Sequence, residues 1–369
     1  MDPLRHPSLP EGIRSRMVEG INGLAMHVLE AGEAGRPALL LLHGFPELAY
    51  SWRKVMLPLA EMGFHVVAPD QRGYGRTTGW DDAYDADLRP FAMLNLVRDQ
   101  LALLRALGIA AVHAVIGHDF GSPVAAHCAL VRPDVFRRVA LMSAPFPGPP
   151  GLGTSMSAPA RDIAADLAAL PRPRKHYHWY YATRQANADL MTCPEGLHAF
   201  FRAYYHHKSG DWPGNDVHPL QGWTAEELAK LPTYYVMDLH ETMPQTVAHE
   251  MPSPEQIAAC AWMTEAEMAV YAQEYGRSGF QGGLNGYRTR FTGTNMEMEA
   301  FAGARIAVPA CFIGGARDWG VQQVPGALRK METVATADWR GTHLVPGAGH
   351  WVQQERPAET LAALREFLR

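Results

Sequence analysis

The sequence predicts an α/β fold in which a mostly parallel sheet, flanked by helices, is interrupted by a large helical insert. Two observations favour this fold. Short aliphatic runs alternate with stretches of helical periodicity over residues 17–142, and the same alternation returns near the end of the chain. A chain of 369 residues, of which 47% are hydrophobic, is also long enough to bury a large core.

The first part of the chain alternates predicted strands and helices in a regular order. The segment 17–30 has the pattern of a hairpin that turns near Asn22 and Gly23. Continuous aliphatic runs, which are typical of strands buried on both faces, then alternate with segments of helical spacing. The predicted strands are 38–42, 64–68, 112–116 and 139–142, and the predicted helices are 52–61, 94–107 and 122–131.

A cluster of proline and glycine at 143–153 ends this rhythm and predicts a linker. The sequence then becomes helical and aromatic, with no repeat and no pattern of a buried strand. A strand is again predicted at 306–314 and a final amphipathic helix at 357–368. The predicted domains are therefore a core of residues 1–145 and 300–369 and a helical cap or lid of residues 146–299.

Composition and charge exclude several classes of function. With 33 basic and 38 acidic residues, the chain offers no basic surface for nucleic acid. No segment reaches the roughly 18–20 apolar residues of a membrane helix, and the polar N-terminus lacks the apolar region of a secretory signal, so we expect a cytoplasmic protein. Widely spaced cysteines, without a CxxC pair, are expected in the core of a protein in a reducing compartment. They are Cys128, Cys193, Cys260 and Cys311.

A candidate nucleophile lies in the segment GHDFG at 117–121, between a predicted strand and a predicted helix. Small residues two before and two after Asp119 permit a sharp turn that exposes its side chain, and the following helix N-terminus favours a negative charge there. Taken alone, this pattern also fits an aspartate that caps a helix.

Three other segments carry residues that complete a nucleophilic site. In HGFPE at 43–47, the Phe45 amide is placed to form an oxyanion hole together with the Phe120 amide. His350, in a glycine-rich loop before the last helix, is a candidate general base. Asp318 follows the strand 306–314 and is placed to orient that histidine.

The order of these residues favours a catalytic site over four unrelated loops. Asp119, Asp318 and His350 follow one another as nucleophile, acid and base, each in a loop next to a predicted strand or the last helix. Loops beyond the carboxyl ends of parallel strands converge on one edge of a sheet, where such folds bind their ligands. The sequence therefore predicts that these three side chains meet.

Five segments together resemble the soluble, cap-bearing epoxide hydrolases of the α/β-hydrolase fold, and the resemblance covers the whole chain. Most other α/β-hydrolases lack the fourth of them. The sequence departs from the family at Phe120, where many members have tryptophan, and in a cap that is longer around 210–251. The segments are HGFPE at 43–47, DQRGYG at 70–75, GHDFG at 117–121, LNGYR at 284–288 and GHWVQQERP at 349–357.

The resemblance implies a two-step reaction with an epoxide and water, and no metal or organic cofactor. Asp119 would open the epoxide to form an ester, and His350 would activate water to hydrolyse it. Tyr287 would protonate the epoxide oxygen together with Tyr177, although Tyr180 and Tyr181 remain open as the partner. The pocket that the resemblance implies includes His43, Pro46, His118, Tyr181 and Trp351.

Other functions remain as alternatives. A dehalogenase uses the same nucleophile, but commonly holds the halide with an N–H donor beside it, and Phe120 offers none. A carboxylesterase would have serine at position 119. A non-catalytic binding protein of the same fold and a homodimer also stay open. Paired histidines suggest no metal site, because a third ligand at suitable spacing is missing; the pairs are His176 and His178, and His206 and His207.

Overall fold

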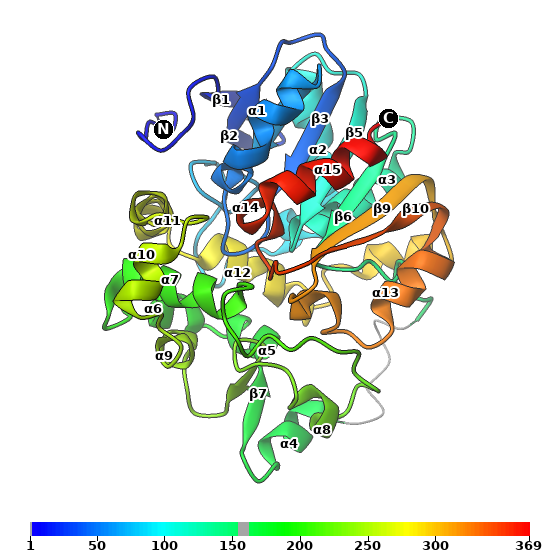
Figure 1. Cartoon of the computed structure of the whole chain (residues 1–369). Coiled ribbons are helices and arrows are strands. Elements are labelled where there is room, and N and C mark those ends of the chain that lie inside the picture. Colours follow the sequence, from blue (N-terminus) through cyan, green and yellow to red (C-terminus); the bar gives the residue numbers. More distant parts are fainter. Residues whose placement is uncertain (1, 154–161) are drawn as a thin grey trace.

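The computed structural model describes residues 2–153 and 162–369, and an eight-stranded sheet forms its centre (Figure 1). The strand order is β1-β2-β4-β3-β5-β6-β9-β10. All pairs from β4 onwards are parallel, whereas β1 and β2 form an antiparallel hairpin and β2 pairs antiparallel to β4. The strands are β1 (Arg14–Ile21), β2 (Leu24–Ala31), β3 (Ala38–Leu42), β4 (His65–Pro69), β5 (Val112–His118), β6 (Val139–Met142), β9 (Ile306–Gly315) and β10 (Thr336–Val345).

Side chains that alternate along β3 join two layers of helices to the sheet. Leu39 and Leu41 pack with α1 and α15, which lie in front of the sheet in Figure 1. Leu40 and Leu42 point to the opposite face and pack with α2 and α3. A run of leucines buried on both faces is therefore what this central strand requires. The helices of the core are α1 (Arg53–Glu61), α2 (Met93–Ala106), α3 (Gly121–Val131), α13 (Ala327–Lys330), α14 (Val352–Glu355) and α15 (Pro357–Phe367).

The cap lies between β6 and β9 and gathers at one end of the sheet (Figure 1). The sequence showed no strand pattern in the cap, and this expectation is wrong. The cap contains β7 (Arg174–His176), which pairs antiparallel with β8 (Val236–Asp238). Each of these strands has three residues, too few to produce a periodic pattern. The cap helices are α4 (Ile163–Ala168), α5 (Tyr177–Tyr181), α6 (Ala186–Met191), α7 (Gly196–Lys208), α8 (Ala225–Leu228), α9 (Met243–Ala248), α10 (Pro254–Ala259), α11 (Glu265–Ser278) and α12 (Gln281–Arg288).

The linker predicted at 143–153 contains no helix or strand, as expected from its prolines and glycines. The boundaries of the cap at 146 and 299 stay predictions. Residues 154–161, within the cap, lie outside the described part of the chain. Over residues 2–153 and 162–369, no helix combines the length and the apolar character that crossing a membrane requires.

Candidate active site

A sharp turn between β5 and α3 holds Asp119 in a left-handed backbone conformation, with a φ of 51°. Such a conformation is uncommon for a residue with a side chain and is maintained by the surrounding packing. Gly117 and Gly121 flank the turn because neither has room for a Cβ atom. A Cβ on Gly117 would lie 2.1 Å from the Gly121 carbonyl oxygen, and one on Gly121 would lie 2.1 Å from the Leu42 carbonyl oxygen.

His350 lies between the two aspartates that the sequence singles out. Its Nε2 is 3.4 Å from Asp119 Oδ2, and its Nδ1 is 3.1 Å from Asp318 Oδ1. Ser143, at the end of β6, completes this group: its hydroxyl donates to Asp318 Oδ2 at 2.5 Å and lies 2.8 Å from His350 Nδ1. The sequence analysis missed Ser143, since a lone serine in a loop carries no signal.

These contacts determine which nitrogen of His350 carries a proton in the neutral ring. The Ser143 hydroxyl gives its proton to Asp318, so both oxygens facing Nδ1 are acceptors and Nδ1–H is the donor. Nε2 then presents a lone pair toward Asp119. Within residues 2–153 and 162–369, Nε2 has no hydrogen-bond partner. This nitrogen is therefore available to take a proton from a bound water.

The backbone amide of Phe45 points at the candidate nucleophile. It donates to Asp119 Oδ1 at 2.9 Å. Gly44 makes this approach possible, because a Cβ on Gly44 would lie 2.3 Å from the Asp119 Cβ. Phe120 directly precedes α3, so its amide belongs to the group of N–H donors at that helix terminus. The Phe45 amide therefore lies against the candidate nucleophile, whereas the part of the Phe120 amide in an oxyanion hole stays a prediction.

The cap brings three of the predicted tyrosines together beside the Phe120 ring, next to the candidate nucleophile in the chain. The Tyr287 ring packs edge-on against Phe120, with centroids 4.7 Å apart. Tyr177 and Tyr181 lie 5.8 Å and 4.9 Å from the Tyr287 ring. The Tyr177 hydroxyl donates to Gln323 Oε1 at 3.1 Å.

Tyr180 points elsewhere, because its hydroxyl donates to Asp189 Oδ2 at 2.9 Å.

Burial raises the pKa of Tyr287 and of Tyr177 well above the ordinary value, and the charge of Asp119 adds to the shift in both. Both hydroxyls are therefore protonated at neutral pH and available as proton donors.

Two carboxylates of the site are ionised although they are buried. Burial alone would raise the pKa of Asp119, but the interaction with His350 in its protonated form and the charges of Lys208 and His118 hold it well below its usual range. Asp318 follows the same pattern: burial opposes ionisation, while His350, the Ser143 hydroxyl and Lys208 lower its pKa. A charged Asp119 is the form that a carboxylate nucleophile requires.

A buried ion pair connects the three loops of the site. Glu47 accepts from the Gly44 amide at 2.9 Å and from His118 Nδ1–H at 2.6 Å, and His118 Nε2–H donates to the His350 carbonyl at 2.7 Å. Because both acceptors lack a proton, both ring nitrogens of His118 are donors and the ring is charged. Burial would lower the pKa of His118, but the charge and hydrogen bond of Glu47 raise it to about 9.

This ion pair predicts a pH dependence of stability. A histidine whose pKa rises from 6.5 to about 9 on folding stabilises the protein fully below pH 6.5, and this contribution disappears as the pH rises through about 9. We expect the free energy of unfolding, measured with urea, to fall by on the order of 1–3 kcal/mol over this range. A Glu47→Gln, His118→Gln double variant has neither titrating group and should have a flatter profile. Equal slopes for both proteins would contradict the charged pair.

Three further residues predicted for the pocket are buried beside the site. His43 Nδ1 lies 2.8 Å from the Gly44 carbonyl, in the loop that carries the Phe45 amide. The Pro46 carbonyl accepts from the Tyr205 hydroxyl at 3.1 Å. Trp351 stacks on the Tyr205 ring at 4.0 Å and donates from its indole N–H to the Tyr205 carbonyl. The contacts of Pro46 and Trp351 with Tyr205 join core and cap. Direct contact of these residues with a substrate stays a prediction.

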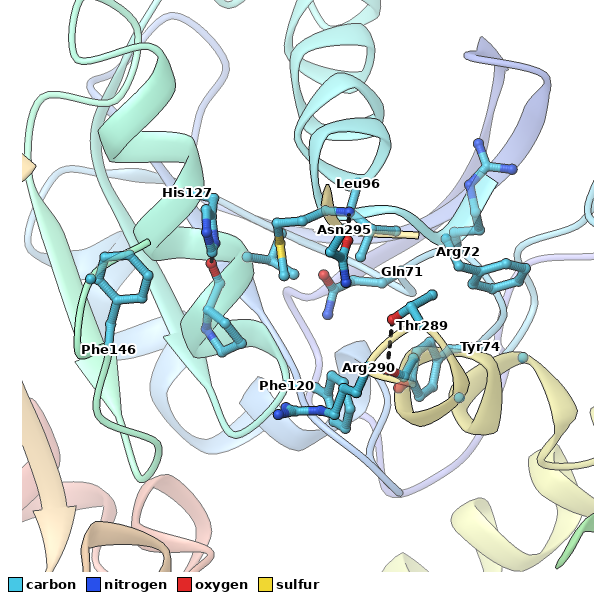
Figure 2. Close-up of a pocket in the computed structure, with 18 residues that line it drawn as sticks. Gln71, Arg72, Tyr74, Leu96, Phe120, His127, Phe146, Thr289, Arg290 and Asn295 are labelled. Atoms are coloured by element: carbon cyan, nitrogen blue, oxygen red, sulfur yellow. Dashed lines mark hydrogen bonds between the residues drawn. The ribbon is translucent and has the colours of Figure 1, made fainter. Parts of the chain in front are cut away.

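An apolar cavity of about 240 Å³ opens between core and cap on the side of Phe120 (Figure 2). Arg290 lies at this cavity with its guanidinium 5.3 Å from the centre of the Phe120 ring. Phe120 is the predicted site residue that lines this cavity. The sequence analysis did not predict the cavity itself. Its apolar lining consists of Phe91, Met93, Leu96, Phe120, Pro123, Val124 and Phe146, and its polar lining of Gln71, Arg72, Tyr74, His127, Thr289, Arg290 and Asn295.

The paired histidines of the cap contact neighbouring protein groups. His176 Nδ1 accepts from the His178 amide at 3.3 Å, and the His207 ring packs against Tyr234. In the described part of the chain, no group of three or more histidine, cysteine, aspartate or glutamate side chains is arranged to hold a metal ion.

Comparisons with known proteins identify the family of the chain. A profile of the alpha/beta hydrolase fold matches residues 37–357. Epoxide hydrolase A of Mycobacterium tuberculosis is 34% identical over 94% of this chain and 95% of its own length. Epoxide hydrolase B of that organism is 32% identical over 90% and 91%.

Solved structures of epoxide hydrolases are also similar to this chain. An epoxide hydrolase from an endophytic Streptomyces superimposes with a TM-score of 0.78 at 31% identity, covering 97% of this chain and 96% of that one. Epoxide hydrolase A from Mycobacterium thermoresistibile has a TM-score of 0.75 at 34% identity, covering 97% and 98%. The chain therefore belongs to the epoxide hydrolase family of the α/β-hydrolase fold.

Proposed function

We propose that the protein converts an apolar epoxide to a vicinal diol through a covalent ester on Asp119. One observation carries the proposal: the Asp119 carboxylate accepts from the Phe45 amide and faces the free Nε2 of His350, while Tyr177 and Tyr287 approach from the cap. These contacts support the roles of nucleophile for Asp119, base for His350 and acids for the two tyrosines. The names of the relatives support the same reaction.

The first step forms the ester. One carboxylate oxygen of Asp119 attacks an epoxide carbon from behind, and the bond from that carbon to the ring oxygen breaks. The ring oxygen takes a proton from Tyr287 or Tyr177, whose raised pKa values keep both hydroxyls protonated at neutral pH. The products of this step are a neutral hydroxyalkyl ester and a tyrosinate.

The second step hydrolyses the ester. His350 Nε2 takes a proton from water, and the water oxygen attacks the carbonyl carbon of the Asp119 ester. The resulting oxyanion is held by the amides of Phe45 and Phe120. As this intermediate collapses, the remaining proton of the former water passes to the departing alkoxide, which releases the diol and restores the Asp119 carboxylate. His350 returns its proton to the tyrosinate. The sum is one epoxide and one water for one diol.

The cavity next to Phe120 supports an apolar substituent on the substrate, such as an aryl ring. Its volume of about 240 Å³ and its lining of phenylalanine, leucine, methionine and valine suit a ring or a short branched chain (Figure 2). Phe120 lines this cavity, and its ring also packs against that of Tyr287 with centroids 4.7 Å apart. A substituent that enters the cavity would therefore lie next to the ring of a cap tyrosine.

Incubation with styrene oxide and, separately, with a 1-haloalkane tests the proposal. We expect the diol from styrene oxide and no halide from the haloalkane, because Phe120 has no donor beside the nucleophile for a departing halide. Chromatography of the diol and halide titration measure the two products. Halide release without diol would establish the rival dehalogenase, and neither product from a panel of apolar epoxides would leave a non-catalytic binding protein.

A further inference from the structure

A buried lysine of the cap, which the reaction steps above do not use, lies beside the candidate catalytic residues. Lys208 is the last residue of α7 and is 2% exposed. Lysine is almost never buried to this degree without a partner. Its ammonium group faces aromatic rings, among them those of Tyr235 and Trp351. Such a costly arrangement calls for a compensating environment.

Four aromatic rings supply part of that environment. The Lys208 Nζ lies 5.3 Å from the ring centre of Tyr204, 5.7 Å from that of Tyr234, 4.9 Å from that of Tyr235 and 5.5 Å from that of Trp351. The negative faces of aromatic rings attract a cation at these distances, and the attraction is larger where water is excluded. The rings also fix the position of the charge.

Lys208 is tied to the catalytic histidine through the backbone. Its carbonyl accepts from the His350 amide at 2.9 Å. Gly349 makes this approach possible, since a Cβ there would lie 2.6 Å from the same carbonyl oxygen. Burial lowers the pKa of the Lys208 ammonium, but the charges of Asp119, Asp318 and Glu47 oppose that shift, with Asp119 the largest of the three. The ammonium therefore acts on the nucleophile across the space of the site.

We infer that Lys208 is a positioning residue whose fixed positive charge favours the second step of the reaction, the hydrolysis of the Asp119 ester. The inference rests on the proposed function. The carboxyl group of Asp119 is negative in the resting enzyme, neutral in the ester and negative again in the tetrahedral oxyanion. A nearby cation stabilises the two negative states of this carboxyl group and has no such effect on its neutral ester. It thus lowers the barrier to hydrolysis and makes the resting carboxylate a slightly weaker nucleophile.

The test compares Lys208→Met with the wild type in the two steps separately. Methionine keeps the backbone contact to His350 and fills the aromatic surroundings with an apolar chain. Rapid-quench mixing with styrene oxide, followed by intact-protein mass spectrometry, gives the rate constants for ester formation and for ester hydrolysis. We expect hydrolysis to slow by about tenfold to a hundredfold while ester formation stays the same or rises. The ester should consequently accumulate during turnover.

Two further variants separate charge from packing. Lys208→Arg retains the charge and should restore most of the hydrolysis rate. Lys175→Met removes the cap lysine whose Nζ lies 5.0 Å from the Tyr180 ring and whose charge acts on Asp189 and Glu241 instead, so it should change neither rate constant. Circular dichroism checks that each variant is folded. If Lys208→Met does not fold, Lys208→Gln tests the same ratio of rate constants.

The outcomes distinguish this inference from the proposed function. Equal slowing of both steps, an unchanged ratio, or failure of Lys208→Arg to restore hydrolysis would overturn the role of Lys208 while the ester mechanism stands. If the wild type forms no ester with any epoxide, the proposed function fails, and the inference fails with it.

Discussion

Replacing Asp119 with asparagine should abolish turnover of an epoxide, with a loss in kcat/KM of at least about 10⁴-fold. The amide keeps the shape of the carboxyl group but lacks the charge that attacks carbon. Asparagine also tolerates the positive φ of 51° at this turn better than alanine does. Because the site favours the ionised form of Asp119, the variant should lose some stability but unfold in one transition.

Asp70→Asn is a matched control for the loss of a buried carboxylate. Interactions with His27 outweigh the burial of Asp70 and lower its pKa to about 2, and it accepts from the Ala49 amide at 2.8 Å. This variant should be destabilised but keep kcat/KM within about tenfold of the wild type. Steady-state kinetics and thermal unfolding of both variants provide the comparison. Full activity of Asp119→Asn, with no reversion to aspartate in its mass spectrum, would eliminate Asp119 as the nucleophile.

The central sheet was predictable because its strands are buried on both faces. The predicted boundaries of 38–42 and 139–142 are those of β3 and β6, and 64–68 is displaced by one residue from β4. In such strands every side chain must be apolar, so the sequence contains an uninterrupted signal. The helices that cover the sheet, such as α2, carry the complementary signal of a single apolar face.

Strands that are only partly buried do not show this continuous apolar pattern in the sequence. The strand β10 (TADWRGTHLV) lies at the edge of the sheet, and most of its side chains are half-buried or exposed. Its composition is therefore that of a surface segment, and the sequence analysis did not predict it. The short pair β7 and β8 in the cap was missed for a related reason, since three residues cannot display a period of two convincingly.

The candidate site divides in the same way. Asp119, Asp318 and His350 were predictable because each lies in a glycine-rich turn at a fixed place relative to a strand. Ser143 and Lys208 were not, because their importance comes from neighbours distant in sequence. A serine in a proline-rich linker and a lysine at the end of an aromatic helix both resemble ordinary surface residues until the fold brings them to His350.

Replacing His350 with glutamine should separate the two steps of the proposed reaction. Ester formation uses Asp119 and the cap tyrosines, so the variant should still react once with styrene oxide. Hydrolysis needs a base at Nε2, and glutamine supplies none, so this step should slow by at least about 10³-fold. Intact-protein mass spectrometry should find the mass of one substrate molecule added, and peptide mapping should assign it to Asp119.

His113→Gln is the control for this variant, because His113 lies at the opposite end of β5 from the candidate nucleophile and bonds to the Leu368 carbonyl at 2.8 Å. It should complete many turnovers and accumulate no adduct. A His350→Gln protein that is folded but forms no adduct would contradict the division of labour, since it would mean that ring opening itself depends on His350. Adduct on a residue other than Asp119 would assign the nucleophile elsewhere. An adduct confined to Asp119 would require that its carboxylate attacks carbon before His350 acts.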